Sequence, residues 1–142
     1  MFCTIIGYPL KNPRSVKIWK EFFKKKKIDM SMKQLEIPNH LFSKKIQKLI
    51  KNKNFLASAV TMPYKKKILK YVSLKDKISK VAKSVNFIIR KKKIIEGFNT
   101  DVYGALISIK KISIKRDLII YGFGGAGEAI CRALYNRYKK MK

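Results

Sequence analysis

Acidic residues are scarce in this 142-residue chain, which has 8 Asp and Glu against 35 Lys and Arg and a formal net charge of +27. An excess of this size normally indicates a nucleic acid or an anionic membrane as partner. Here most basic residues are lysines, spread through every segment among many Ile, Asn, Phe and Tyr residues, a usage typical of AT-rich genomes. We therefore interpret the charge mainly as a solvated surface. Weak, non-specific RNA binding stays an alternative, because lysines cluster at 24–27, 65–67 and 91–93.

Cysteine, histidine and long apolar runs are also rare. The two cysteines, Cys3 and Cys131, lie far apart and form no CxxC motif, so we expect both to be reduced packing residues. With a single histidine and no cysteine pair, we expect no metal site. No stretch of about eighteen apolar residues is present, and the segment MFCTIIGYPL lacks the pattern of a signal peptide. The expectation is a cytoplasmic protein without membrane contact.

What remains is a chain of globular composition, 46% hydrophobic and long enough for about one domain. Predicted strands alternate with helical patterns, the strands at 2–8, 31–37, 55–62 and 84–90 and the helices at 15–27, 40–52 and 65–82. This alternation predicts an α/β fold, with helices on both faces of an open sheet. The segments SVNFIIR and KIIEGFN read as a hairpin, so the sheet is predicted to be mixed.

A glycine-rich turn follows an apolar run near the end of the sequence. The run DLIIYGF, residues 117–123, predicts a strand buried on both faces, and a helix is predicted from about Ala126 to Lys140. The GxGxxG pattern between them, Gly122, Gly124 and Gly127, is typical of turns that cradle a dinucleotide pyrophosphate at a helix N-terminus. The same pattern also serves ordinary strand-to-helix turns. The residue that distinguishes NAD from NADP would lie about twenty positions further on, after the last residue of this sequence.

Two polar stretches interrupt predicted strands. In VTMPYKK, Thr61 and Lys65 flank Pro63 at the carboxyl end of an apolar run, where open α/β sheets bind ligands. In SVNFII, Asn86 is a polar amide inside an otherwise apolar strand. The Asn86 amide either contacts a ligand or satisfies a neighbouring backbone group, and the sequence leaves both open.

A third polar stretch, GFNTDVYG, precedes a helix predicted at about 101–114. Three of its side chains, Asn99, Thr100 and Asp101, are of types that cap helices. Capping needs only one of them, so the other two are candidates for a different role.

These stretches, together with the glycine-rich turn, resemble the shikimate dehydrogenase family. That family carries, in order, a GxPxxHSxSP-like start, an NVTxPxK turn, a GAxN strand, a GxNTDxxG turn and a GxGGA nucleotide loop. The corresponding stretches here are GYPLKNPRSV, AVTMPYK, KSVN, GFNTDVYG and GFGGA, in the same order over nearly the whole chain. The resemblance implies NADPH-dependent reduction of 3-dehydroshikimate to shikimate, in the shikimate pathway of aromatic amino acid biosynthesis, with NADP as cofactor.

The resemblance also implies a role for each matching residue. Lys65 and Asp101 correspond to a catalytic pair. Thr61, Asn86 and Asp101 correspond to substrate contacts, and Ser15 to one of two serines that hold the substrate carboxylate. The implied cofactor-binding residues are Gly122, Phe123, Gly124, Gly125 and Ala126. A lysine ammonium suits ketone reduction, because it can stabilise the negative charge that develops on oxygen and supply the proton.

The motifs depart from the family pattern at several positions that bear on substrate affinity. Asn12 and Pro13 stand where the family has His-Ser, which removes one serine contact and one backbone donor. Ala59 stands where an Asn usually precedes the VT dipeptide, and Lys83 and Ser84 replace Gly-Ala.

The resemblance divides the chain into a substrate-binding and catalytic domain at 1–101, a connector helix at 102–116 and an incomplete NADP-binding Rossmann domain at 117–142. Family members continue well beyond this length, so the expectation is a truncated or split enzyme, with a second polypeptide able to complete the nucleotide-binding domain. Two alternatives are a non-catalytic remnant that keeps only the substrate domain as a binding module, and a basic RNA-binding protein.

Overall fold

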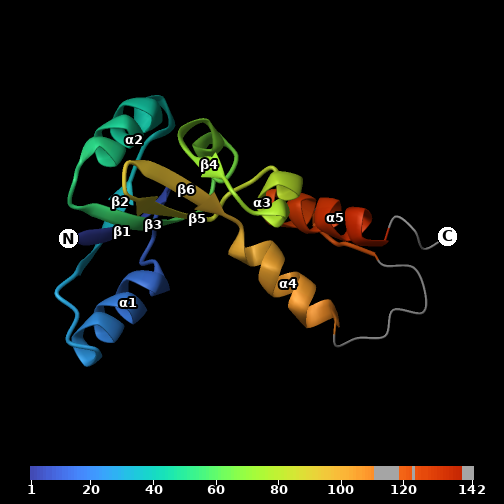
Figure 1. Cartoon of the computed structure of the whole chain (residues 1–142), viewed down its shortest axis with the longest axis horizontal. Helices are drawn as coiled ribbons and strands as arrows, with labels where there is room; N and C mark the ends of the chain where they lie inside the picture. The colour runs from blue at the N-terminus through green and yellow to red at the C-terminus, as the bar shows by residue number, and fades with distance from the viewer. Residues whose placement is uncertain (111–118, 123, 139–142) are drawn as a thin grey trace.

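A computed structural model of the chain describes residues 1–110, 119–122 and 124–138 (Figure 1). The elements up to residue 60 are β1 (Phe2–Gly7), α1 (Arg14–Lys25), β2 (Ser31–Glu36), η1 (Asn39–Leu41), α2 (Phe42–Lys51) and β3 (Phe55–Val60). The following elements are η2 (Lys67–Tyr71), β4 (Ser73–Leu74), α3 (Lys77–Ala82), β5 (Phe87–Lys91), β6 (Ile94–Phe98), α4 (Thr100–Lys110) and α5 (Gly125–Tyr138). The predicted alternation is confirmed up to β3, with element ends that differ by a few residues.

The strands form one six-stranded sheet in the order β2-β1-β3-β5-β6-β4. β1 is parallel to β2 and β3, whereas β5 is antiparallel to both β3 and β6. β5 and β6 form the predicted hairpin, whose turn contains Lys92 with a φ of 56°. The sheet is therefore mixed, as predicted.

Helices α1 and α2 lie on opposite sides of the sheet (Figure 1). Successive strand residues point to opposite faces, so neighbours in β1 reach two different cores. Ile6 packs with Phe42 and Ile46 of α2, while Ile5 packs with Phe23 of α1. Full burial of side chains of this size stabilises the fold by roughly 1.5–3 kcal/mol each.

The single helix predicted at 65–82 is wrong, because this segment forms η2, β4 and α3. β4 pairs in parallel with β6, and a Cβ added at Gly97 of β6 would lie 2.7 Å from Val72 Cγ2. The lack of a side chain at Gly97 therefore lets the segment approach the sheet. Asp76 then begins a new helix, where its Oδ1 accepts a hydrogen bond from the Ser79 amide at 2.8 Å.

Helices α3, α4 and α5 pack together beyond the end of the sheet (Figure 1) through a cluster that includes Ala82, Val102, Ala129 and Ala133. The predicted helix after the glycine-rich turn is confirmed as α5. The strand predicted at 117–123 is not formed in its described part: residues 119–122 belong to no strand, and the Tyr121 side chain is fully exposed. Residues 117, 118 and 123 lie outside the described residues. A strand buried on both faces needs neighbouring strands and covering helices, and the described sheet supplies none at this position.

Candidate functional site

Four of the predicted site residues lie at one edge of the sheet because of its mixed topology: Thr61, Lys65, Asn86 and Asp101. Thr61 follows the carboxyl end of β3, while Asn86 precedes the amino end of the antiparallel β5. The Asn86 carbonyl accepts a hydrogen bond from the Val60 amide at 2.8 Å, and the Asn86 amide donates to the Phe98 carbonyl at 3.0 Å. The ends of β3 and β6 thus meet the start of β5. The turn that carries Lys65 and the first turn of α4, which carries Asp101, leave the sheet at this edge.

The turn that carries Lys65 is anchored on both sides. Tyr64 is completely buried, stacks on Phe42 with ring centroids 4.1 Å apart and donates a hydrogen bond to the Ile37 carbonyl. Burial raises the pKa of the Tyr64 phenol, so this group stays a protonated donor. The Lys65 carbonyl accepts a hydrogen bond from the Val85 amide at 2.8 Å. The backbone at Lys65 is therefore fixed next to β5.

Lys65 and Asp101, 36 positions apart in sequence, form an ion pair with Nζ and Oδ2 2.6 Å apart. The Lys65 side chain is 19% exposed and the Asp101 side chain 40%. Asp101 lies in the first turn of α4, where the helix dipole favours a carboxylate. The pair is a charge-assisted hydrogen bond that a ligand can still reach from the Asp101 side.

The three polar residues at the start of α4 have different hydrogen-bond partners. Asn99, which is 5% exposed, caps the helix: its Oδ1 accepts from the Val102 amide at 3.0 Å and its Nδ2 donates to the Ser84 carbonyl at 3.0 Å. The Thr100 amide donates to Asn86 Oδ1 at 2.8 Å, and Asn86 Nδ2 donates to Thr100 Oγ1 at 2.8 Å. Asn86 thus satisfies a backbone group, and its Nδ2 keeps a second proton for a ligand.

Thr61 and Ser15 make other contacts than those of the ion pair. The Thr61 amide donates to the Ile6 carbonyl at 2.9 Å, and a Cβ added at Gly7 would lie 2.5 Å from Thr61 Cγ2. Ser15 lies half-buried in the first turn of α1 and makes no hydrogen bond through its side chain within the described ranges. No described contact joins either residue to Lys65 or Asp101.

The glycine-rich turn uses glycine for two reasons, backbone conformation and close approach. Gly122 has a φ of 93°, which favours glycine, and a Cβ added at Gly127 would lie 2.0 Å from the Gly122 carbonyl oxygen. A Cβ added at Gly124 or Gly125 would meet nothing within 4 Å, so the backbone is open to a ligand there. Of the predicted cofactor residues, only Phe123 lies outside the described residues.

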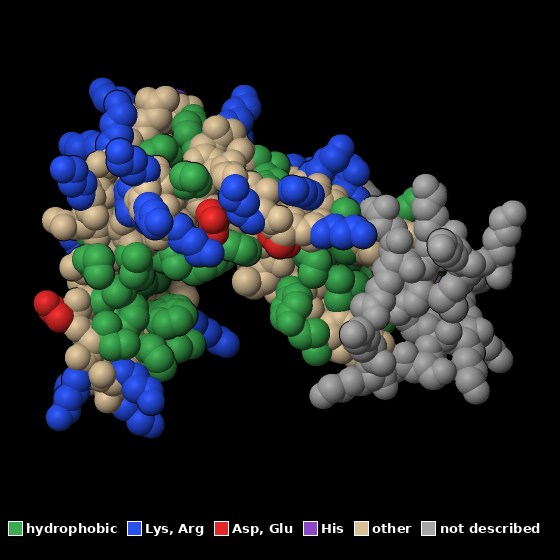
Figure 2. Space-filling model, in the orientation of Figure 1, with side chains coloured by type: hydrophobic (Ala, Val, Ile, Leu, Met, Phe, Trp, Pro, Cys, Tyr) green, Lys and Arg blue, Asp and Glu red, His purple; other side chains and the backbone are tan. Residues whose placement is uncertain are grey.

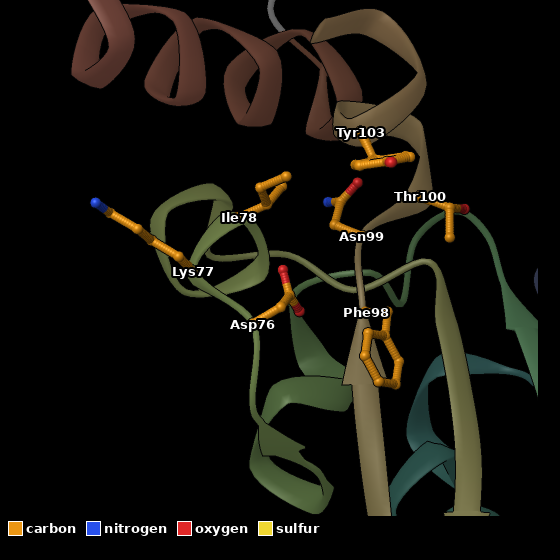
Figure 3. Close-up of a pocket in the computed structure, with 7 residues that line it drawn as sticks. All are labelled: Asp76, Lys77, Ile78, Phe98, Asn99, Thr100 and Tyr103. Atoms are coloured by element: carbon orange, nitrogen blue, oxygen red, sulfur yellow. The ribbon is translucent and has the colours of Figure 1, made fainter. Parts of the chain in front are cut away.

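A cavity of about 390 Å³ lies next to the site but does not contain it. Figure 3 shows its lining residues, Asp76, Lys77, Ile78, Phe98, Asn99, Thr100 and Tyr103, which come from the start of α3 and the junction of β6 with α4. A second cavity of about 230 Å³ lies between α1 and the sheet. None of Lys65, Asp101, Asn86 and Thr61 lines either of these two cavities.

One polar contact of the site was missed from the sequence. Lys66 forms an ion pair with Glu128 in α5, and Arg132 binds the other carboxylate oxygen of Glu128 at 3.0 Å. Lys66 and Glu128 are 62 positions apart, so no local pattern links them. The sequence offered one indication of a role for Glu128: it is an acidic residue in the first turn of the predicted helix, where the helix dipole favours a carboxylate.

The fold and the site define an α/β domain with a lysine–aspartate pair at its sheet edge, joined to a glycine-rich turn. Residues 5–88 match the family model described as the shikimate dehydrogenase substrate binding domain. This match covers more than half of the chain, and the chain therefore belongs to the shikimate dehydrogenase family.

Individual relatives agree with this assignment. The shikimate dehydrogenase (NADP(+)) of Thermotoga maritima is 31% identical over 133 residues, which is 94% of this chain and 49% of the relative. The crystal structure of the Thermotoga maritima shikimate dehydrogenase gives a TM-score of 0.82 at 28% identity, covering 96% of this chain and 51% of that one. Shikimate 5-dehydrogenase from Listeria monocytogenes, solved in complex with shikimate and NAD, gives a TM-score of 0.76 at 25% identity, with coverage of 93% and 47%. This chain spans about half the length of the curated relatives it matches.

Within the described ranges, no helix is long and apolar enough to cross a membrane. In the same ranges, His, Cys, Asp and Glu side chains do not gather in groups of three or more that could hold a metal ion.

Proposed function

We propose that this chain binds shikimate and 3-dehydroshikimate at the sheet edge and takes part in the NADPH-dependent reduction of 3-dehydroshikimate. The observation that carries the proposal is the ion pair of Lys65 with Asp101, 2.6 Å apart, next to the Asn86–Thr100 pair. The name of the Thermotoga maritima relative, shikimate dehydrogenase (NADP(+)), supports this cofactor, and the Listeria monocytogenes complex with shikimate supports this substrate.

In the proposed reaction Lys65 donates the proton. Reduction of the ketone places negative charge on its oxygen, and the Lys65 ammonium stabilises that charge and then transfers a proton from Nζ to the oxygen. Asp101 holds Nζ in place and offers a carboxylate oxygen to a neighbouring substrate hydroxyl. Thr100 binds the Oδ1 atom and one N–H of the Asn86 side chain. The remaining N–H of Nδ2 donates to a second hydroxyl of the substrate.

Thr61 and Ser15 are assigned to substrate binding. Each has a hydroxyl of the type that binds a carboxylate or a hydroxyl group, and the Ser15 hydroxyl has no partner within the described part of the chain. The basic surface supports an anionic substrate: Figure 2 shows Lys and Arg side chains spread over the face around α2 and towards α3. A surface of this sign raises the local concentration of anions.

The glycine-rich turn is assigned to NADP. The assigned residues are Gly122, Phe123, Gly124, Gly125 and Ala126, with the first turn of α5 next to the phosphates. NADPH, when bound, supplies the hydride. Four points stay predictions: the preference for NADP over NAD, a cytoplasmic location, a second polypeptide that completes the nucleotide-binding part, and weak RNA binding.

Calorimetric titration of the purified chain with shikimate tests the proposal. We expect saturable binding that weakens about tenfold or more in Lys65→Met and in Asp101→Asn, because each variant removes a charge-assisted hydrogen bond. The matched control is Lys70→Met, an exposed lysine of η2 in the same connection. A chain that folds but binds no shikimate, or a Lys65→Met variant with unchanged affinity, would contradict the assignment.

A further inference from the structure

Two neighbouring lysines after β3 reach two different helices. Lys65 pairs with Asp101 in the first turn of α4, and Lys66 pairs with Glu128 in the first turn of α5. The Val85 amide holds the Lys65 carbonyl, so both lysines project from a fixed piece of backbone. One turn therefore sets the position of the candidate proton donor and also touches the helix that follows the glycine-rich turn.

The Glu128 carboxylate is well placed to transmit this contact. Its side chain is 19% exposed, and the Glu128 amide donates to the Gly124 carbonyl at 2.9 Å, directly within the glycine-rich segment. Arg132, one helical turn later, donates to Glu128 Oε1 through Nε and Nη2 at 3.2 and 3.0 Å. Hydrogen bonds from Lys66 and from Arg132 lower the pKa of Glu128, so the carboxylate stays ionised at neutral pH. Arg132 orients the carboxylate, and Lys66 connects it to the substrate domain.

The apolar part of this contact is only partly buried at its margin. Ala129 and Ala133 of α5 pack on Ala82 and Val102, and the larger side chains around them, Ile78, Leu106 and Ile130, are partly buried. Figure 1 shows α5 beyond the end of the sheet, alongside α3 and α4, where the sheet itself does not cover it. Apolar contacts are not directional, so they favour burial of this face of α5 more than one exact position along it. A charged pair with defined geometry supplies the missing constraint.

We propose that Glu128 is a positioning residue, whose ion pair with Lys66 sets the glycine-rich turn at a defined position relative to the Lys65–Asp101 pair. This inference rests on the proposed function for its consequence: the turn would hold the cofactor and the pair would hold the substrate. Hydride transfer needs the two within near contact, and a shift of about 1 Å at such a site is costly. The Lys66–Glu128 ion pair itself can be tested without any bound substrate or cofactor.

Zero-length carbodiimide crosslinking tests the contact, because it joins a lysine amine to a carboxylate only where the two touch. We expect amides between Lys66 and Glu128 and between Lys65 and Asp101, both identified by mass spectrometry of the purified chain. The second amide is an internal standard for the first. Formation of the Lys65–Asp101 amide without the Lys66–Glu128 amide would overturn the inference.

Amide hydrogen exchange of residues 124–135 tests the positioning role. We expect Lys66→Met and Glu128→Gln each to speed exchange in this segment several-fold. The double variant should be no faster than Glu128→Gln alone, because Glu128→Gln already removes the ion pair with Lys66 and weakens the one with Arg132. Lys66→Arg should restore slow exchange while losing the amide crosslink, because a guanidinium keeps the ion pair but does not react. Lys70→Met is the surface control and should change neither readout.

The two proposals fail separately. Shikimate affinity should be the same in Lys66→Met as in the unaltered chain, because Lys66 faces α5 and not the substrate. If no variant binds shikimate while the crosslink and the exchange effect persist, the proposed function fails and the ion pair stands. Unchanged exchange in Lys66→Met, or no recovery in Lys66→Arg, would refute the positioning role even where shikimate binds.

Discussion

Replacing Asn99 by Ala should separate a structural role from a functional one within a three-residue stretch. The variant loses the cap on the Val102 amide, worth about 1 kcal/mol, and two hydrogen bonds from Nδ2 to the Ser84 carbonyl and hydroxyl, worth roughly 0.5–1.5 kcal/mol each. Because Asn99 is 5% exposed, its former partners lie buried without a replacement. We expect a loss of roughly 2–4 kcal/mol in the free energy of unfolding, out of roughly 5–15 kcal/mol for a typical domain.

The assay is urea unfolding followed by circular dichroism, with the thermal midpoint as a second reading. The midpoint should fall by roughly 4–16 °C. Asp101→Asn is the matched control, because it alters a 40% exposed side chain and should change stability by less than about 1 kcal/mol while weakening shikimate binding. If Asn99→Ala unfolds like the unaltered chain, or if Asp101→Asn is the less stable of the two, the division of tasks between cap and site is wrong.

Three further predictions concern the glycine-rich turn and the surface charge. Gly127→Ala should displace the turn, because its Cβ would lie 2.0 Å from the Gly122 carbonyl oxygen, and hydrogen exchange in α5 should become faster; unchanged exchange would mean that the turn adapts at no cost. Hydrogen bonds from Lys66 and Arg132 lower the pKa of folded Glu128, so its stabilisation of α5 is complete above its ordinary pKa of 4.5 and is lost as pH falls through the lower folded value. Amide hydrogen exchange of α5, measured as a function of pH, should show this loss of stability. A Glu128→Gln variant with the same pH profile would disprove the role of the Glu128 carboxylate. RNA affinity in filter binding should be weak, independent of sequence and steeply reduced by salt, whereas tight sequence-selective binding at physiological salt would reverse our interpretation of the charge.

The parts of the fold that local pattern determines could be predicted from the sequence. The first three strands alternate with helices because apolar side chains recur with the period of each element, and the hairpin of β5 and β6 follows from two apolar runs around a lysine-rich turn. The segment at 65–82 could not be predicted in this way. Its pairing with β6 depends on Gly97, which lies outside the segment and leaves room for Val72.

The location of the candidate site could be predicted from the sequence, but the role of each of its residues could not. The pattern before α4 showed more capping residues than a helix needs. Which of them caps depends on partners elsewhere: Asn86 binds Thr100 across 14 positions, and Lys65 binds Asp101 across 36. The residues of the Lys66–Glu128 pair are 62 positions apart, so no helical or strand periodicity could have predicted their contact. Contacts of this kind follow from the sheet topology, which the sequence predicts only in outline.

The position of bound shikimate tests the central claim most directly. In amide NMR spectra of the isotope-labelled chain, titration with shikimate should shift the signals of Thr61, Lys65, Asn86 and Asp101, at the sheet edge where β3 ends and β5 begins. The signals of Lys77 and Ile78, which line the 390 Å³ cavity away from the ion pair, should move little. Saturable shifts confined to Lys77 and Ile78, with the Lys65 and Asp101 signals unmoved, would contradict the account.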